Sequence, residues 1–214
     1  MLSKLQKWLA ENPHAIALPI LLGLYLLCFF ALDFWMREPR FILHNPLDDL
    51  IPFNEWFAGF YFIWFAVFPL ALVAFLLLDK DDFQELCFVI FAGAGVCFLA
   101  YIVLPTGLEL RPETVPRDNL GTRLMQFIWL IDSPNNVCPS LHCSISAAIA
   151  LQTWRSRKLQ YRYWLKTAVT VLMLLICLAT LFVKQHSVWD VAAGWALSLL
   201  LFGIAEAWRR RRGI

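Results

Sequence analysis

The feature that most constrains this chain is a series of long, nearly uncharged apolar blocks. A helix that crosses the hydrocarbon core of a bilayer needs about 17–25 mostly apolar residues. Six blocks approach or meet that length, and we expect each to be a transmembrane helix. They comprise residues 15–32, 56–78, 86–104, 137–154, 167–183 and 188–208. The fourth block is the weakest of them, because it opens with polar residues before it becomes apolar.

The composition agrees with these blocks. Of 214 residues, 60% are hydrophobic and only 16% are charged, whereas soluble domains average about 45–50% apolar and about 25% charged residues. An ordinary cytosolic domain and a disordered chain are therefore excluded. The net charge of +2 is too balanced for a nucleic-acid-binding protein. No internal repeat or linker divides the sequence, so we expect one all-α membrane bundle over residues 1–214.

The Lys and Arg residues predict the orientation. The first block has no small-residue cleavage site, so we interpret it as a span and not as a removed signal peptide. Six crossings place both termini on one side, and the positive-inside rule makes that side cytoplasmic. Twelve cations then lie inside, at positions 4, 7, 80, 155, 157, 158, 162, 166 and 209–212, and six lie outside, at positions 37, 40, 111, 117, 123 and 184.

Two outer loops are longer than the others. Residues 33–55 are rich in aromatic residues and proline, which is typical of an interfacial segment. Residues 105–136 contain a short apolar stretch at 124–131. This stretch is too short to span, and we expect an interfacial helix that roofs whatever lies beneath it.

The unusual polar residues converge on the outer face. Ionisable groups at membrane depth are costly and usually functional. Six such residues follow the third block, open the fourth, end the fifth or open the sixth, and the topology brings all of them to one depth. They are Arg111, Ser140, His142, Lys184, His186 and Asp190.

His186 and Asp190 are four residues apart, so on a helix they share one face. A carboxylate there can accept the proton of one ring nitrogen, which leaves the other nitrogen free to act as a nucleophile or a base. Ser140 and His142 follow Pro139 at a predicted helix start, where free backbone N–H groups attract anions. Arg111 and Lys184 add positive charge. Together these residues indicate a phosphate site with a nucleophile and a general acid.

These residues resemble a known family. Pro139-Ser140-Leu141-His142, the segment from Lys184 through His186 to Asp190, and Arg111-Pro112 are similar to the three motifs of the type 2 phosphatidic acid phosphatase superfamily. The resemblance implies a helical bundle with a motif-bearing core at residues 105–194. It implies that His186 attacks phosphorus, Asp190 orients it and His142 protonates the leaving oxygen. Arg111, Ser140 and the backbone of Leu141 would then bind phosphate.

The sequence departs from the family pattern at several positions. Leu104 stands where the first motif has Lys, Leu141 replaces a Gly, and Ala179-Thr180 replace Ser-Arg. Lys184 could supply the lost charge. The pattern resembles a divergent branch that includes bacterial lipid phosphatases and transferases of phosphoinositol headgroups to sphingolipids.

Several readings stay open from the sequence. The leading one is a metal-independent phosphatase, without a cofactor, that hydrolyses a phosphorylated lipid at the non-cytoplasmic face of a bacterial inner membrane. The same site could instead transfer a headgroup to a lipid alcohol. His142, His186 and Asp190 could form a two-His, one-carboxylate metal site, or the chain could be a transporter or scaffold. Cys138 and Cys143 leave a disulfide or a metal role open, and the oligomeric state is not predicted.

Overall fold

The fold was obtained as a computed structural model that describes residues 2–35, 38–115 and 117–212, with side chains described from residue 6 to residue 211 of these ranges. Arg37 and the side chains of Lys4 and Arg212, which entered the charge count, lie outside the described part. The regular secondary structure of the described chain is helical, apart from one short pair of strands. Its main helices are α1 (Leu2–Glu11), α2 (Ala17–Phe34), α4 (Ala58–Leu78), α5 (Lys80–Val103), α7 (Leu141–Arg155), α8 (Tyr163–Phe182) and α9 (Val188–Arg212).

Five helical segments are long and apolar enough to cross a bilayer within the part of the chain that is described. They are Pro13–Phe34, which includes the short 3-10 helix η1 (Pro13–Ile16), then Glu55–Leu78, which includes η2 (Glu55–Phe57), and finally Lys80–Val103, Tyr163–Phe182 and Val188–Arg211. The expected all-α membrane bundle is therefore confirmed. The count of six spans stays a prediction, because the fourth expected block forms α7, which has only 15 residues.

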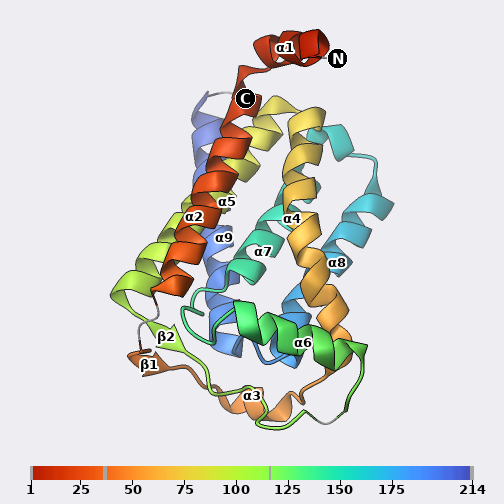
Figure 1. Cartoon of the computed structure of the whole chain (residues 1–214). Coiled ribbons are helices and arrows are strands. Elements are labelled where there is room, and N and C mark those ends of the chain that lie inside the picture. The colour runs from red at the N-terminus through yellow and green to blue at the C-terminus, as the bar shows by residue number, and fades with distance from the viewer. Residues whose placement is uncertain (1, 36–37, 116, 213–214) are drawn as a thin grey trace.

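The α7 helix occupies the centre of the bundle. It contacts α4, α5, α8 and α9, and Figure 1 shows these helices around it. Most of its residues are buried, including polar ones such as Ser144, Ser146 and Gln152. Because its surroundings are protein and not lipid, α7 can carry polar side chains that a lipid-facing helix could not. This position explains the weak hydropathy of the fourth block.

Short elements cover one end of the bundle, at the bottom of Figure 1. Strand β1 (Phe41–Ile42) pairs in parallel with β2 (Thr106–Gly107) and ties the two long loops together. The helices α3 (Pro46–Leu50) and α6 (Leu120–Ile131) lie beside this pair. The predicted helix at 124–131 is thus present, and it begins four residues earlier than the apolar stretch. Asn119 caps it by accepting a hydrogen bond from the Thr122 N–H, 3.0 Å away.

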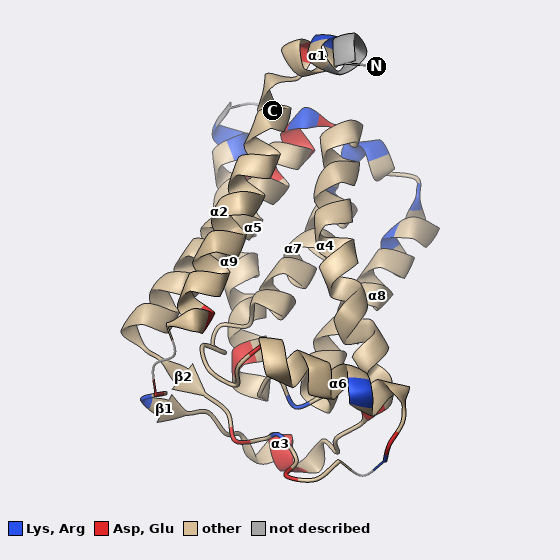
Figure 2. Ribbon diagram, in the orientation of Figure 1, with Lys and Arg blue, Asp and Glu red and all other residues tan. Residues whose placement is uncertain are grey.

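The opposite end carries both ends of the described chain and a concentration of charge (Figure 2). There, Glu85 of α5 contacts Arg155 of α7 and Arg209 of α9, each at 3.2 Å, and Glu206 also pairs with Arg155. These partly buried ion pairs join three helices at their ends. The 3-10 helix η3 (Arg157–Leu159) follows directly and adds further basic residues. Both ends of the described chain thus lie at one end of the bundle.

Candidate active site

A histidine–aspartate pair stands where the chain leaves α8 and enters α9. His186 Nδ1 lies 2.7 Å from Asp190 Oδ2, and the other carboxylate oxygen accepts the Ser187 N–H at 2.7 Å. Asp190 is fully buried, so both of its oxygens are held by specific partners. A carboxylate bonded at Nδ1 favours the tautomer that carries the proton there. The Nε2 atom is then the nitrogen with a free lone pair.

The N-terminus of α7 packs against this pair. Ser140 caps the helix, since its Oγ accepts the Cys143 N–H at 3.3 Å, and its own backbone N–H donates to the carbonyl oxygen of Asp190 at 3.0 Å. The backbone of α9 comes this close because residue 194 is glycine. A Cβ atom there would lie 2.6 Å from the carbonyl oxygen of Ser140. The first N–H groups of α7, which begins at Leu141, have no partner within the helix.

His142 projects from the first turn of α7 and is held between aromatic rings. Its ring centroid lies 4.5 Å from that of Tyr61 and 4.1 Å from that of Trp64, both on α4. The ring centroids of His142 and His186 are 5.6 Å apart. The His142 Nε2 atom is buried and has no hydrogen-bond partner among the described residues. The two histidines thus face each other across a gap that could accept a phosphoryl group.

Arg111 reaches the same region from the loop after β2. Its Nε and Nη2 atoms donate to Gln185 Oε1 at 3.1 and 2.7 Å, and Nη2 also donates to the carbonyl oxygen of Asp132 at 2.6 Å. The guanidinium carbon lies 5.8 Å from the ring centroid of Trp129. Burial lowers the pKa of Arg111 from its ordinary value, but guanidinium groups stay protonated in proteins. The site therefore contains one fixed positive charge, most of whose donors already contact the protein.

Lys184 is placed differently from the expectation. Its Nζ donates to the backbone carbonyl of Asp48 in α3, 2.6 Å away, and it is not among the described residues that line the cavity below. Burial lowers the pKa of its ammonium group. The Asp48 carboxylate in turn accepts the Ser187 hydroxyl at 2.6 Å and the Val188 N–H at 2.9 Å. Lys184 and Asp48 thus fasten α3 to the segment that carries His186.

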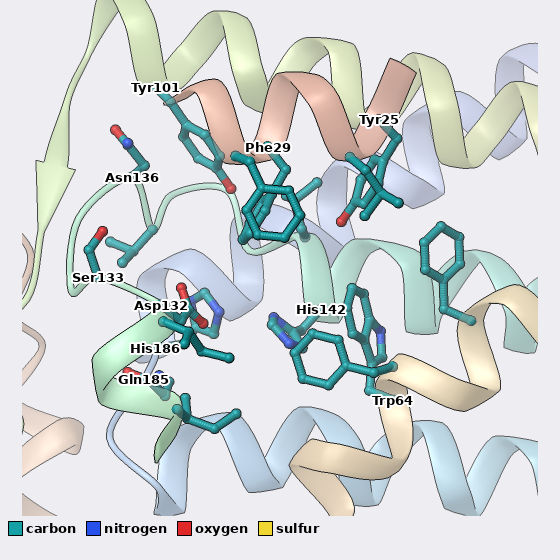
Figure 3. Close-up of a pocket in the computed structure, with 18 of the residues that line it drawn as sticks. Tyr25, Phe29, Trp64, Tyr101, Asp132, Ser133, Asn136, His142, Gln185 and His186 are labelled. Carbon is teal, nitrogen blue, oxygen red and sulfur yellow. The ribbon is translucent and has the colours of Figure 1, made fainter. Parts of the chain in front are cut away.

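A cavity of about 320 Å³ opens from the two histidines into the bundle. Figure 3 shows His142, His186, Asp132 and Gln185 close together, with Tyr25, Phe29 and Trp64 beyond them. The wall is apolar over most of its area and comes mainly from α2 and α4. Its apolar residues include Leu22, Leu26, Phe29, Phe30, Phe65 and Phe68. A site with a few polar groups at one end and a long apolar wall suits an amphipathic ligand.

Several residues of the site were not identified from the sequence. Gln185, Asp132, Tyr61 and Trp64 all surround the two histidines. Tyr61 donates its hydroxyl to Asp132 Oδ2 at 2.8 Å across 71 positions of sequence. The only sequence signal was local: Gln185 lies inside the Lys-Gln-His motif, and Asp132 directly follows the apolar stretch at 124–131.

Two open questions from the sequence concern metals and disulfides. No group of three or more His, Cys, Asp or Glu residues with a metal-binding arrangement occurs among the residues described. Cys138 and Cys143 are free thiols. Cys143 is buried in α7 and lies 3.8 Å from the Thr180 hydroxyl, measured from its sulfur to Oγ1.

Comparison with known proteins gives one match. The family described as the PAP2 superfamily matches residues 85–214, which include most of α5, all of α7, α8 and α9, and every expected site residue. The helices α2 and α4, which form much of the cavity wall, precede the matched region. No curated protein and no solved structure matches the chain.

Proposed function

This chain belongs to the PAP2 superfamily, and we propose that it is an integral membrane enzyme that hydrolyses a phosphomonoester or a pyrophosphate of a lipid. Members of this superfamily are generally metal-independent phosphatases. The observation that carries the proposal is the His186–Asp190 pair, which stands at the polar end of a mostly apolar cavity. Residues 1–214 act as one membrane domain in this proposal, with the chemistry in residues 105–194.

The proposed reaction has two steps. In the first, His186 Nε2 attacks phosphorus, the bond to the lipid oxygen breaks, and His142 donates a proton to that oxygen. In the second, His142 takes a proton from water, and the resulting hydroxide displaces His186 and releases phosphate. A covalent intermediate divides one difficult displacement into two easier ones. Asp190 holds the proton on Nδ1 and stabilises the positive charge that develops on the ring.

The phosphoryl oxygens need positive partners during both steps. The proposal assigns this role to the first backbone N–H groups of α7 at Leu141, with Ser140 shaping the turn and Arg111 supplying the charge. Electrostatic groups that are already oriented are usually a large contribution to rate enhancement. Lys184 anchors α3 to the catalytic loop in this proposal, because its ammonium group donates to the Asp48 carbonyl.

The alternative is transfer of a headgroup to a lipid or polyol alcohol by the same site. One observation favours it: hydrogen-bonding side chains of Asp132, Ser133, Asn135 and Asn136 line the cavity beside the histidines. Such groups suit a ligand with several hydroxyls. In that reaction the donor is a phosphodiester lipid, whose headgroup stays on the phosphoryl group that His186 takes while the lipid alcohol leaves. A second lipid alcohol then replaces water in the second step, and the product is a new phosphodiester lipid.

The test is turnover by purified protein in detergent. We expect phosphate release from at least one member of a panel of lipid phosphates and pyrophosphates, undiminished by a chelator, and its loss in His186→Ala. His44→Ala is a matched control. His44 is exposed, its Nε2 lies 2.9 Å from Asp49 Oδ1, and it does not line the cavity. Turnover retained in His186→Ala would overturn the mechanism. With a phosphodiester lipid and an added lipid alcohol, a new phosphodiester product without free phosphate would favour the transferase. Chelator sensitivity would favour a metal enzyme.

The proposed setting is a bacterial inner membrane with the site towards the periplasm or exterior. The partners are then a phosphorylated lipid substrate and the surrounding membrane lipids, with no nucleic acid. No cofactor is invoked, because the two histidines and Asp190 can carry out nucleophilic and acid–base steps by themselves.

A further inference from the structure

Gln185 directly precedes the proposed nucleophile and has no role in the steps above. It is only 4% exposed, and it lines the same cavity as His142 and His186. A primary amide has one acceptor oxygen and two N–H donors on its nitrogen. Which of its two ends faces the cavity therefore decides what Gln185 can bind.

Arg111 fixes this orientation. A guanidinium group has donors only, so the amide atom that faces it must be the oxygen. Two guanidinium nitrogens converge on Gln185 Oε1, at 3.1 and 2.7 Å. The amide nitrogen must then point away from Arg111. Figure 3 shows Gln185 next to His186 at the wall of the cavity, with His142 across from them.

The Gln185 nitrogen has no hydrogen-bond partner there. It is buried and unpaired among the described residues, as is Nε2 of His142. Buried donors are nearly always paired in folded proteins, and one that is not commonly marks a functional position or a missing ligand. With Nε1 of Trp64, which lines the same cavity and is likewise unpaired among the described residues, three such nitrogens occur there. They indicate a ligand rich in acceptors, and phosphoryl oxygens are acceptors.

We propose that Gln185 donates a hydrogen bond to an oxygen of the phosphoryl group that is transferred, and that Arg111, besides supplying charge, orients this amide. The proposal rests on the proposed function. It also accounts for the lost third-motif arginine: Thr180 stands there and donates its hydroxyl to the Cys177 carbonyl at 2.7 Å. A neutral donor next to the nucleophile replaces the missing charged one.

The decisive variant is Gln185→Glu. The new carboxylate has nearly the same shape and still accepts both Arg111 donors, so the contact between positions 185 and 111 is kept. Its second oxygen, however, replaces an N–H donor with a negative acceptor that repels phosphate. We expect kcat/KM to fall about 10²-fold, as for loss of an oxyanion donor, with the melting temperature unchanged. Activity of Gln185→Glu within about threefold of wild type would overturn the proposal.

A matched control is Gln160→Glu, the same change at an exposed turn after η3, which should keep wild-type kinetics. A second measurement uses inorganic vanadate, whose five-coordinate form resembles phosphorus during transfer. Gln185→Glu should weaken vanadate binding by a factor similar to its loss in kcat/KM, measured by protection against thermal unfolding. Equal vanadate binding by Gln185→Glu and wild type would also contradict the proposal.

The two proposals fail in different ways. Normal turnover by Gln185→Glu together with an inactive His186→Ala would remove only the role of Gln185. Turnover that survives in His186→Ala would remove the proposed mechanism instead. Vanadate binding does not need the lipid substrate, so it tests Gln185 even if no member of the lipid panel is hydrolysed.

Discussion

At the scale of single residues, the site combines charges that oppose one another. Arg111 is the fixed cation, and Asp132 is an acidic group whose carboxylate accepts the Tyr61 hydroxyl. Asp132 is partly reachable from the cavity but is densely surrounded by protein, and this burial raises the pKa of its carboxyl above the ordinary value. The hydrogen bond from Tyr61 and the nearby His186 and Arg111 lower this pKa less than burial raises it. The ionised form of Asp132 is therefore disfavoured in the folded state.

This shift predicts a pH-dependent stability. Between the ordinary and the raised pKa, folded protein keeps a proton that unfolded protein releases, so stability falls as pH rises through that window. Asn is neutral throughout. We expect Asp132→Asn to melt at a higher temperature than wild type at neutral pH, and the difference to vanish at about pH 4, near the ordinary pKa of Asp. Thermal unfolding in detergent from pH 4 to pH 8 measures this.

Asp118 provides a control of opposite sign. It is exposed, and its hydrogen bond with Arg123 lowers the pKa of the carboxyl. Asp118→Asn should therefore change the melting temperature little, and any change at neutral pH should be a decrease. If the melting temperatures of Asp132→Asn and wild type instead differed by the same amount at every pH, the pKa of the Asp132 carboxyl would not be raised in the folded protein.

The parts of the site that could be predicted from the sequence are those that depend on residues close together in the chain. The contact between His186 and Asp190 was expected from helical spacing. It forms at 2.7 Å, although His186 lies in the turn before α9, which begins at Val188. Arg111 and Gln185 contact each other across 74 positions, and no pattern within one sequence encodes such a contact. Lys184 was expected at the phosphate, but its ammonium group donates to α3. The charge of Lys184 is evident from the sequence, whereas the direction in which its side chain points depends on tertiary structure.

At the scale of elements, apolar blocks located most helices, and they were least informative where protein replaces lipid around a helix. The segment at 137–154 was expected to span the bilayer, but α7 begins only at Leu141 and is enclosed by its neighbours. The amphipathic helix α1 and the pairing of β1 with β2 were not predicted. Two-residue strands and a single surface helix leave too weak a pattern to be recognised against long apolar blocks.

The crossing of α7 and α9 is the element contact on which the site depends. It sets the position of His142 relative to His186 and Asp190, and Gly194 allows the close approach. In Gly194→Ala the new methyl group would overlap the Ser140 carbonyl and force the helices apart. We expect at least a tenfold loss of kcat, since displacements of about 1 Å can cost 10²-fold, and about 1–3 kcal/mol of stability.

The same helix contains the matched control. A Cβ atom at Gly203 would have no neighbour within 4 Å, so Gly203→Ala should leave turnover and melting temperature near wild type. Both variants add one methyl group to α9. Equal activity of the two variants would show that the close approach at Gly194 does not set the geometry of the site.

At the scale of the whole molecule, the two ends of the bundle differ in charge and in the presence of the histidine site. Most of the described basic residues lie around η3 and the end of α9, at the end that carries the termini (Figure 2). The histidine site lies at the other end, under α6 (Figure 1). Cytoplasmic loops carry an excess of Lys and Arg. We therefore expect the η3 end to be cytoplasmic and the site to open towards the opposite face.

This orientation can be measured with single cysteines at exposed positions of the two ends. Asp118→Cys lies before α6, and Gln160→Cys lies after η3. A membrane-impermeant maleimide should label Asp118→Cys in intact cells and Gln160→Cys only after the membrane is opened, with the wild-type chain reporting any reaction of its own thiols. The reverse pattern would place the histidines in the cytoplasm. Because the charge pattern and the site share one rigid bundle, that result would require the proposed substrate to be presented from the cytoplasmic leaflet.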